Sequence, residues 1–276
     1  METRGTKMRK HHHNQPKTIR SRIIDMVLIL IIIIGIGMTG HYFYQRHAIK
    51  QSDQQTTQLA NKVVTKNKTK TSMPSEGNIK INWKKLAKTN PNIKAWVYIP
   101  GTNINYPVLQ AKNNSYYLDH NEHNKPSVTG QIFMDYRNSA KLTSQNTFLY
   151  GHDVYDASKF SYLNHYFKAD FFKAHRHVYL YTPTKKYVGT IFAVQANRGP
   201  SRAQTLTFKN HKNMKSYVKY LKRKSAVKTT NVKTSSVNKI LTLWTCTERA
   251  VPDDSGKTIP KDKTRTFVSA SLKEVK

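Results

Sequence analysis

The sequence contains a single cysteine, Cys246, among 276 residues. One thiol cannot form an intramolecular disulfide, so a domain outside the cytoplasm would have to fold without such cross-links. The sequence also lacks zinc-finger spacing, an RNA-recognition aromatic pattern, basic-leucine heptads and any evident internal repeat. The length of 276 residues leaves room for one domain of ordinary size with appendages.

Acidic residues are scarce: Asp and Glu number 15 against 47 Lys and Arg, which gives a formal net charge of +32. Such a charge predicts attraction to nucleic acid or to an anionic surface. The basic residues are spread along the whole chain and are not gathered into one recognition motif. The charge therefore describes the surroundings of the protein, an acidic polymer or membrane, and not its activity.

One long apolar run is present, over residues 23–44, and no second one follows. Its 22 residues can cross a hydrocarbon core of about 30 Å, and Tyr42, Phe43 and Tyr44 form an aromatic belt at one end. Residues 1–22 are a basic tail, so the positive-inside rule predicts a cytoplasmic N-terminus and an extracellular remainder. A cleaved signal peptide is the alternative, but the run is long and no clear Ala-x-Ala site follows. We expect an uncleaved, single-pass anchor in the cell membrane.

Residues 45–78 are rich in Gln, Thr, Lys and Asn, which predicts a polar extracellular spacer, helical at most near the membrane. We expect the folded domain to cover residues 79–276. Alternating and helical periodicities give the following elements: helices over 82–90, 158–165, 168–174 and 210–223, and strands over 95–99, 104–109, 130–135, 146–150, 177–182, 187–196, 239–246 and 265–272. Many short strands with few helices indicate a mainly β fold, a barrel or a sandwich.

The cysteine lies at the end of one of these predicted strands. Residues 240–244 alternate and are rich in β-branched and aromatic side chains, and Cys246 stands where this pattern gives way to a polar loop. That position favours chemistry. The alternative is a buried cysteine that packs as a small hydrophobe. A lone cysteine becomes a nucleophile candidate only with a suitable histidine elsewhere in the chain.

His152 is the histidine that meets this requirement. It follows the apolar strand 146–150 and Gly151, so it too lies at a strand terminus. The pairs His120/His123 and His175/His177 have spacings that a metal could use, but no second cysteine or convincing acidic partner accompanies them. We therefore predict no metal and no cofactor. A cysteine at one strand end and a histidine past another is the arrangement that thiol catalysis requires.

Several stretches together carry a recognisable pattern. The cysteine segment is Thr242-Leu-Trp-Thr-Cys246, and the histidine segment is Tyr150-Gly-His-Asp153. Further matches are Asn103–Val108, Gly130–Arg137, Phe160-x-x-Leu163 and Phe171-Phe172. In these stretches the chain resembles the sortases, the membrane-anchored cysteine transpeptidases of Gram-positive bacteria, and it looks most like class B. The resemblance covers roughly residues 79–272 in the correct order.

The resemblance implies an eight-stranded sortase β-barrel with an N-terminal helical extension. It also implies a catalytic set in which Cys246 is the nucleophile, His152 the general acid and base, and Arg265 the stabiliser of substrate and oxyanion. The loop between Cys246 and Arg265 is longer than expected for class B, so Arg249 is a competitor for the arginine. From the cysteine motif, Thr242, Leu243 and Thr245 are expected to contact the peptide. Asp153 replaces the more usual Asn and receives no role.

The expected reaction is cleavage of a sorting-signal peptide and transfer of its acyl part to an amine. In the family the amine belongs to a cell-wall precursor or, in pilus-building members, to a lysine of another subunit. Two alternatives stay open: a hydrolytic cysteine peptidase of the envelope, and a non-enzymatic, basic wall-binding protein. A nucleic-acid partner is disfavoured because the predicted topology places the domain outside the cell.

Overall fold

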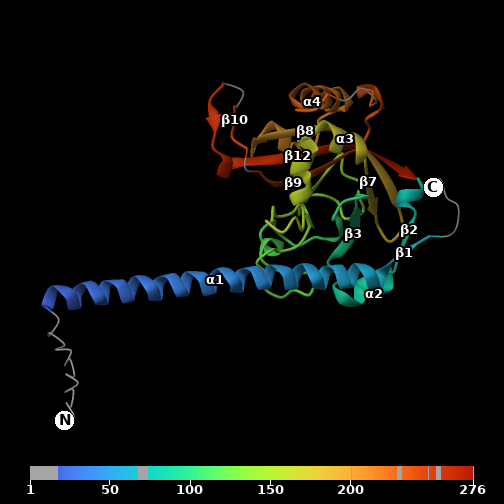
Figure 1. The fold of residues 1–276 in the computed structure, drawn as a ribbon. Coiled ribbons are helices and arrows are strands. Elements are labelled where there is room, and N and C mark those ends of the chain that lie inside the picture. Colours follow the sequence, from blue (N-terminus) through green and yellow to red (C-terminus); the bar gives the residue numbers. More distant parts are fainter. Residues whose placement is uncertain are drawn as a thin grey trace, which may run out of the picture. The chain divides into compact units, whose positions relative to one another are not determined.

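The computed structural model describes residues 18–67, 74–199, 201–228, 232–247, 249–252 and 256–275. Eight strands in this part of the chain form a closed barrel in the order β12-β8-β7-β3-β4-β5-β6-β9. Figure 1 labels five of them, β3, β7, β8, β9 and β12. The barrel strands are β3 (Ile93–Tyr98), β4 (Asn105–Leu109), β5 (Phe133–Met134), β6 (Asn146–Tyr150), β7 (His177–Tyr181), β8 (Lys186–Arg198), β9 (Ile240–Cys246) and β12 (Thr264–Val275). The predicted mainly β, eight-stranded barrel is confirmed.

Most neighbouring strands are antiparallel, but β4–β5 and β6–β9 are parallel pairs. The strand predicted over 130–135 is reduced to the two residues of β5. The residues before β5 form loop contacts and not strand pairs. The backbone amide of Gln131 donates to the Tyr117 carbonyl at 2.9 Å, and Gly130 adopts a positive φ of 51°.

The helices lie near their predicted positions. The α-helices after the first are α2 (Trp83–Thr89), α3 (Ala169–Ala174) and α4 (His211–Lys224), and the 3-10 helices are η1 (Ser75–Gly77), η2 (Tyr116–Leu118), η3 (Ser161–Phe167), η4 (Arg202–Gln204), η5 (Thr234–Ser236) and η6 (Lys261–Lys263). The helix predicted from residue 158 begins only at Ser161, because Ala157 and Lys159 have left-handed backbones with φ of 61° and 55°.

Strand alternation separates the core into an inner and an outer part. Leu241, Leu243 and Val268 point into the barrel, where they belong to the inner cluster of buried side chains. Phe267 points outward and packs with a second cluster that also contains Phe148 and Tyr150. Helix α4 lies over the outside of β8 (Figure 1). It packs there through its buried, regularly spaced apolar residues.

The chain divides into two compact units, residues 1–47 and 48–276, and the first helix, α1 (Ile19–Val63), has residues in each of them. In the first unit its apolar residues are exposed, for example Ile29 at 55% and Ile33 at 59%. Among the described residues this is the one helix that is long and apolar enough to cross a membrane.

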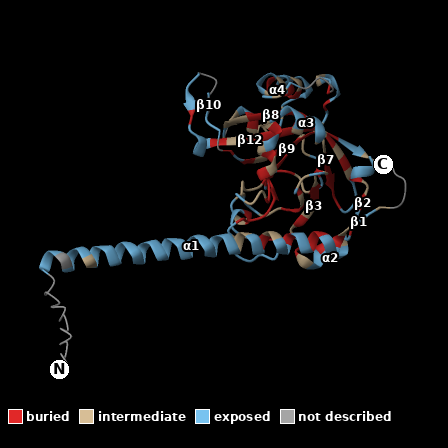
Figure 2. Ribbon diagram, in the orientation of Figure 1, coloured by how far each residue is buried: buried red, intermediate tan, exposed pale blue. Residues whose placement is uncertain are grey.

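The second unit begins at Ala48, which differs from the spacer expected over residues 45–78. Residues 48–63 continue α1, and their Thr56, Leu59 and Val63 are buried within the second unit. Figure 2 shows red, buried segments in this part of α1. The chain then forms β1 (Val64–Lys66), which pairs with β2 (Ile79–Ile81). The polar composition led to the prediction of a spacer because the buried face of this helix combines small polar with apolar residues.

The loop after the cysteine strand also contains regular structure. Its strands β10 (Val251–Pro252) and β11 (Thr258–Ile259) pair as an antiparallel hairpin, and η6 leads into β12. Glu248 and residues 253–255 of this loop lie outside the described residues.

Candidate active site

The ends of three adjacent strands bring the predicted catalytic residues together. In the parallel pair β6–β9, Tyr150 is the partner of Trp244. His152 and Cys246 each lie two residues beyond that pair, at the same end of the two strands. On the other side of β9, Arg265 of β12 is the antiparallel partner of Cys246. Strands β6, β9 and β12 therefore carry His152, Cys246 and Arg265 to one edge of the barrel.

Cys246 is exposed at the end of β9. Alternation places it on the same outer face as Trp244, whereas Leu243 and Thr245 point inward. Those two neighbours are 1% and 2% exposed. The structure therefore excludes the interpretation of Cys246 as a buried, packing hydrophobe.

The His152 ring is held by one backbone group. Its Nε2 lies 2.8 Å from the Leu118 carbonyl oxygen. Because a carbonyl can only accept, Nε2 carries the hydrogen, and Nδ1 is the nitrogen left to exchange a proton. Gly130 makes room for this carbonyl: a Cβ at Gly130 would lie 2.4 Å from the Leu118 oxygen.

Gly151 is needed for close packing, although its place at the end of a strand suggests a turn that only glycine could adopt. Its φ is not in the left-handed region, but a Cβ there would lie 2.3 Å from Ile132 Cδ1 and 2.9 Å from the Phe160 ring. The glycine therefore allows close packing beneath the His152 backbone rather than an unusual backbone conformation.

The two competing arginines occupy different surroundings. Arg265 Nη1 donates to the carbonyls of Asp262 at 2.9 Å and Thr264 at 2.7 Å. Its guanidinium carbon lies 6.0 Å from the centroid of the Trp244 ring. The Arg249 guanidinium instead stacks over Phe167 at 4.4 Å. Only Arg265 is in register with Cys246 on a neighbouring strand, which favours it over Arg249.

Trp244 covers the outer face of β9 beside the cysteine. Its ring contacts Tyr150 at 4.6 Å in an edge-to-face arrangement and Phe267 at 5.9 Å. Gly199 passes so close that a Cβ there would lie 2.8 Å from the Trp244 ring. The residues flanking Cys246 on this face are therefore an aromatic cluster with a half-buried indole.

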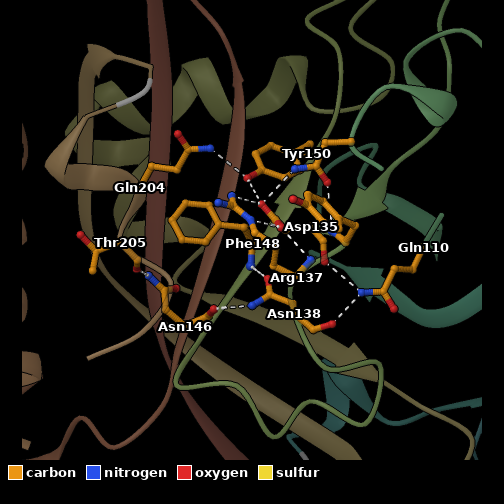
Figure 3. A network of polar contacts seen from close by, with 11 residues as sticks. Gln110, Asp135, Arg137, Asn138, Asn146, Phe148, Tyr150, Gln204 and Thr205 are labelled. Carbon is orange, nitrogen blue, oxygen red and sulfur yellow. Dashed lines mark hydrogen bonds and ion pairs between the residues drawn. The ribbon is translucent and has the colours of Figure 1, made fainter. Parts of the chain in front are cut away.

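A polar network supports the strand that carries His152 (Figure 3). Tyr150 donates to Asp135 Oδ2 at 2.7 Å, and Arg137 binds both oxygens of the same carboxylate at 2.9 and 2.8 Å. Burial alone would raise the pKa of the fully buried Asp135 carboxyl, but these hydrogen bonds outweigh it and hold the pKa below its ordinary value. The network fixes the end of β6 next to His152.

The motif residues expected to contact peptide are not open to it. Thr242 is fully buried and donates to Asn146 Oδ1 at 3.0 Å. Leu243 belongs to the barrel core, and Thr245 is 2% exposed. Thr242 and Trp244 both share the face of Cys246, but only Trp244 is half-buried and next to it on that face, and counting back two positions from the cysteine along a strand could have selected it.

A pocket of about 640 Å³ opens beside this edge. Its lining includes Asp153 and Val154, which follow His152, and Thr247 and Arg249, which follow Cys246. Asn164 also lines it. Among the described residues, no group of three or more His, Cys, Asp or Glu side chains is arranged to hold a metal ion.

Comparisons with known proteins identify the family. The sortase domain matches residues 97–271. Sortase B of Listeria monocytogenes is 31% identical over 83% of this chain and 91% of its own length. Sortase B of Staphylococcus aureus is 30% identical over 81% of this chain and 88% of its own length.

Solved structures share the fold. A Staphylococcus aureus sortase B–substrate complex superposes with a TM-score of 0.61 at 31% identity, covering 70% of this chain and 85% of that one. A Bacillus anthracis protein described as similar to sortase B gives a TM-score of 0.63 at 29% identity, covering 84% and 97%.

Proposed function

The chain belongs to the class B sortases, which are cysteine transpeptidases, and on that premise we propose that Cys246, His152 and Arg265 perform its reaction. The observation that carries this assignment is the register of β6, β9 and β12, which brings the three residues to one edge. A nucleophile, a proton carrier and a fixed cation are the groups that acyl transfer requires.

In the first half-reaction the Cys246 thiolate attacks the carbonyl carbon of a sorting-signal peptide. The carbonyl oxygen becomes an oxyanion, and Arg265 stabilises it with charge-assisted hydrogen bonds. When the intermediate collapses, the C–N bond breaks and His152 gives its proton to the departing amine. The product is a thioester between Cys246 and the acyl part of the peptide.

In the second half-reaction an amine attacks the thioester. His152, now neutral, accepts the proton of the incoming amine, and the C–S bond breaks to return the thiolate. The acceptor class is an amine of a cell-wall precursor or a lysine of a pilin subunit. A base that accepts the proton of the attacking amine can serve either of these two amines.

We propose that residues 23–44 anchor the enzyme in the cell membrane, with the basic tail in the cytoplasm and the catalytic unit outside. The exposed apolar surface of α1 and the Lys- and Arg-rich sequence before it support this topology. The anchor would hold the enzyme where secreted substrates and lipid-linked acceptors are concentrated.

The test is a peptide-library assay with an added amine. We expect product that contains both the cleaved peptide and the amine, and loss of at least about 10³-fold in kcat/KM for both Cys246→Ala and His152→Ala. If both variants still transpeptidate, the catalytic assignment is lost. If cleavage proceeds at the same rate without the amine and only hydrolysed peptide accumulates, the enzyme is a hydrolytic peptidase.

A further inference from the structure

We propose that Asn164 is a positioning residue that holds the ends of the three catalytic strands in register through its one side-chain amide. This inference rests on the proposed catalytic roles of Cys246, His152 and Arg265. Asn164 lies on η3 and has no place in the reaction described above.

The Asn164 amide makes three hydrogen bonds, one toward each strand end. Its Nδ2 donates to Asp153 Oδ2 at 2.8 Å and to the backbone carbonyl of Cys246 at 3.2 Å. Its Oδ1 accepts from the Thr266 hydroxyl at 2.5 Å. Asp153 follows His152, and Thr266 follows Arg265. A single amide therefore joins Cys246 to the immediate neighbours of His152 and Arg265.

The chemistry of the partners requires an amide at this position. A carboxylate and a carbonyl only accept hydrogen bonds, so the group that faces Asp153 and Cys246 must be a donor. The Thr266 hydroxyl is fully buried and needs an acceptor. Asp would offer no donor, and an apolar side chain would leave the buried Thr266 hydroxyl without its partner.

The amide is held firmly because the residues on either side of it are locked in the barrel. Leu163 and Tyr166 are fully buried in the inner core, and the Tyr166 hydroxyl donates to the His175 carbonyl at 2.8 Å. Helix η3 packs against both β9 and β12. Asn164 thus links the rigid core to the strand ends that carry Cys246, His152 and Arg265.

The expected consequence is kinetic. Cys246 is the last residue of β9, and the Asn164 bond restrains its carbonyl at the point where the strand gives way to the loop. A misplacement of about 1 Å between reacting groups can cost about 10²-fold in rate. Loss of Asn164 should therefore lower kcat far more than it raises KM.

The experiment compares Asn164→Leu, Asn164→Asp and the double variant Asp153→Asn/Asn164→Asp in the full chain. We expect each single variant to lose about 10- to 100-fold in kcat, with KM changed less than about threefold. Asn164→Asp places two carboxylates together. In the double variant the new amide at position 153 can donate to the new carboxylate at position 164, so activity should rise above that of Asn164→Asp. Lys168→Ala, an exposed neighbour beyond η3, is the control and should match the wild type.

A readout independent of substrate is the pH profile of alkylation of Cys246 by iodoacetamide. A displaced strand end should shift this profile in Asn164→Leu, whereas simple destabilisation would not. The inference is overturned if Asn164→Leu keeps its kcat within twofold, or if its loss of activity only follows its unfolded fraction while the alkylation profile stays unchanged. Failure of the proposed function would look different, because Cys246→Ala would then remain active.

Discussion

Over its last four residues the cysteine strand alternates between buried and more exposed side chains, and this alternation decides what each of these residues can do. Cys246 and Trp244 share the outer face, while Leu243 and Thr245 are buried behind it. The same rule applied to β12 places Arg265 on the face of Cys246, since directly opposed residues of an antiparallel pair point to the same side. This outer face therefore carries Trp244 and Cys246 of β9 beside Arg265 of β12.

The choice between the two arginines can be tested directly. We expect Arg265→Ala to lower kcat/KM by about 10²- to 10³-fold, because a donor to the oxyanion contributes about that factor. Arg265→Lys should recover only part of it, since an ammonium lacks the planar fork of the guanidinium. Arg249→Ala should change kcat/KM less than about threefold, and steady-state kinetics with one peptide and one amine would measure all three. The reverse ranking would transfer the role to Arg249.

Asp135 should make stability depend on acid pH. Its pKa in the folded protein is held below the ordinary value, so its contribution is present above the unfolded pKa of about 3.9 and is lost as the pH falls through the folded pKa. We expect Asp135→Asn to lower the free energy of unfolding at pH 7 by about 2–3 kcal/mol and to flatten its decline in acid. Urea titrations from pH 7 to 3 would measure both.

The matched control is Glu274→Gln. Glu274 pairs with Lys185 at 2.9 Å on the surface, where both side chains are almost half exposed. An exposed pair contributes about 0–1 kcal/mol, so this variant should change little. Equal losses for Asp135→Asn and Glu274→Gln would contradict the role of the buried network.

The sequence pointed to two of the proposed catalytic residues because strand ends leave a readable signal. Cys246 and His152 each stand where an apolar run meets a polar loop, whereas Arg265 was assigned from the family resemblance; the structure brings all three to one edge. Asn164 gave no such signal. It is one polar residue in a short helix, and its value depends on which strands η3 crosses, which is a property of the tertiary fold.

At the scale of elements, the part of α1 in the second unit contacts the loop of His152 through buried polar side chains. Lys159 lies on that loop and is fully buried, with its Nζ 3.4 Å from Thr56 Oγ1 of α1. Glu122 is equally buried, and its Oε2 accepts from Gln131 at 2.7 Å and from Thr56 at 3.4 Å. Burial lowers the pKa of the Lys159 ammonium, and the charge of Glu122 opposes that shift. Opposite charges thus share one buried network.

A double-mutant cycle tests this coupling. Lys159→Met alone leaves Glu122 as a buried, uncompensated charge, and we expect a loss of about 3–5 kcal/mol in the free energy of unfolding. Glu122→Met alone should be costly for the same reason. The double variant should lose much less than the sum, because well-packed apolar residues can replace a buried charge pair without loss. Urea denaturation of the four proteins gives the coupling, and additive losses would show that the two charges act independently.

This contact also explains why the spacer prediction differed from the structure. The residues of α1 that pack on the second unit include Ser52 and Thr56, which read as solvated positions in a sequence rich in Gln and Thr. Their hydroxyls are satisfied by groups far away in the chain, such as Thr129 at 2.8 Å from Ser52. Local composition cannot reveal such partners. The barrel strands were predictable because their signal, alternation, is local.

At the scale of the whole molecule, the net charge of +32 predicts attraction to anionic surfaces. The attraction is long-ranged and is screened beyond about 8 Å at physiological ionic strength. It can therefore concentrate the protein near an acidic surface, while the choice of peptide must come from contacts at the reactive edge.

The second unit should be the smallest part of the chain that keeps full stability, and it begins at Ala48 rather than at Ile79. Residues 48–78 bury Leu59 and Val63, the Val63 carbonyl accepts from the Asn82 amide at 2.8 Å, and β1 pairs with β2. Burial of a Leu and a Val side chain stabilises by about 3–6 kcal/mol in total.

We expect residues 48–276 to unfold at a distinctly higher urea concentration than residues 79–276. A chain that begins at residue 68 should unfold at the same urea concentration as 79–276, because both lack α1 and β1 and both keep β2. Coincident urea transitions for all three chains would show that α1 contributes nothing to the stability of the catalytic unit. If a shortened chain kept its stability but lost kcat, α1 would instead act by positioning the loop that carries His152.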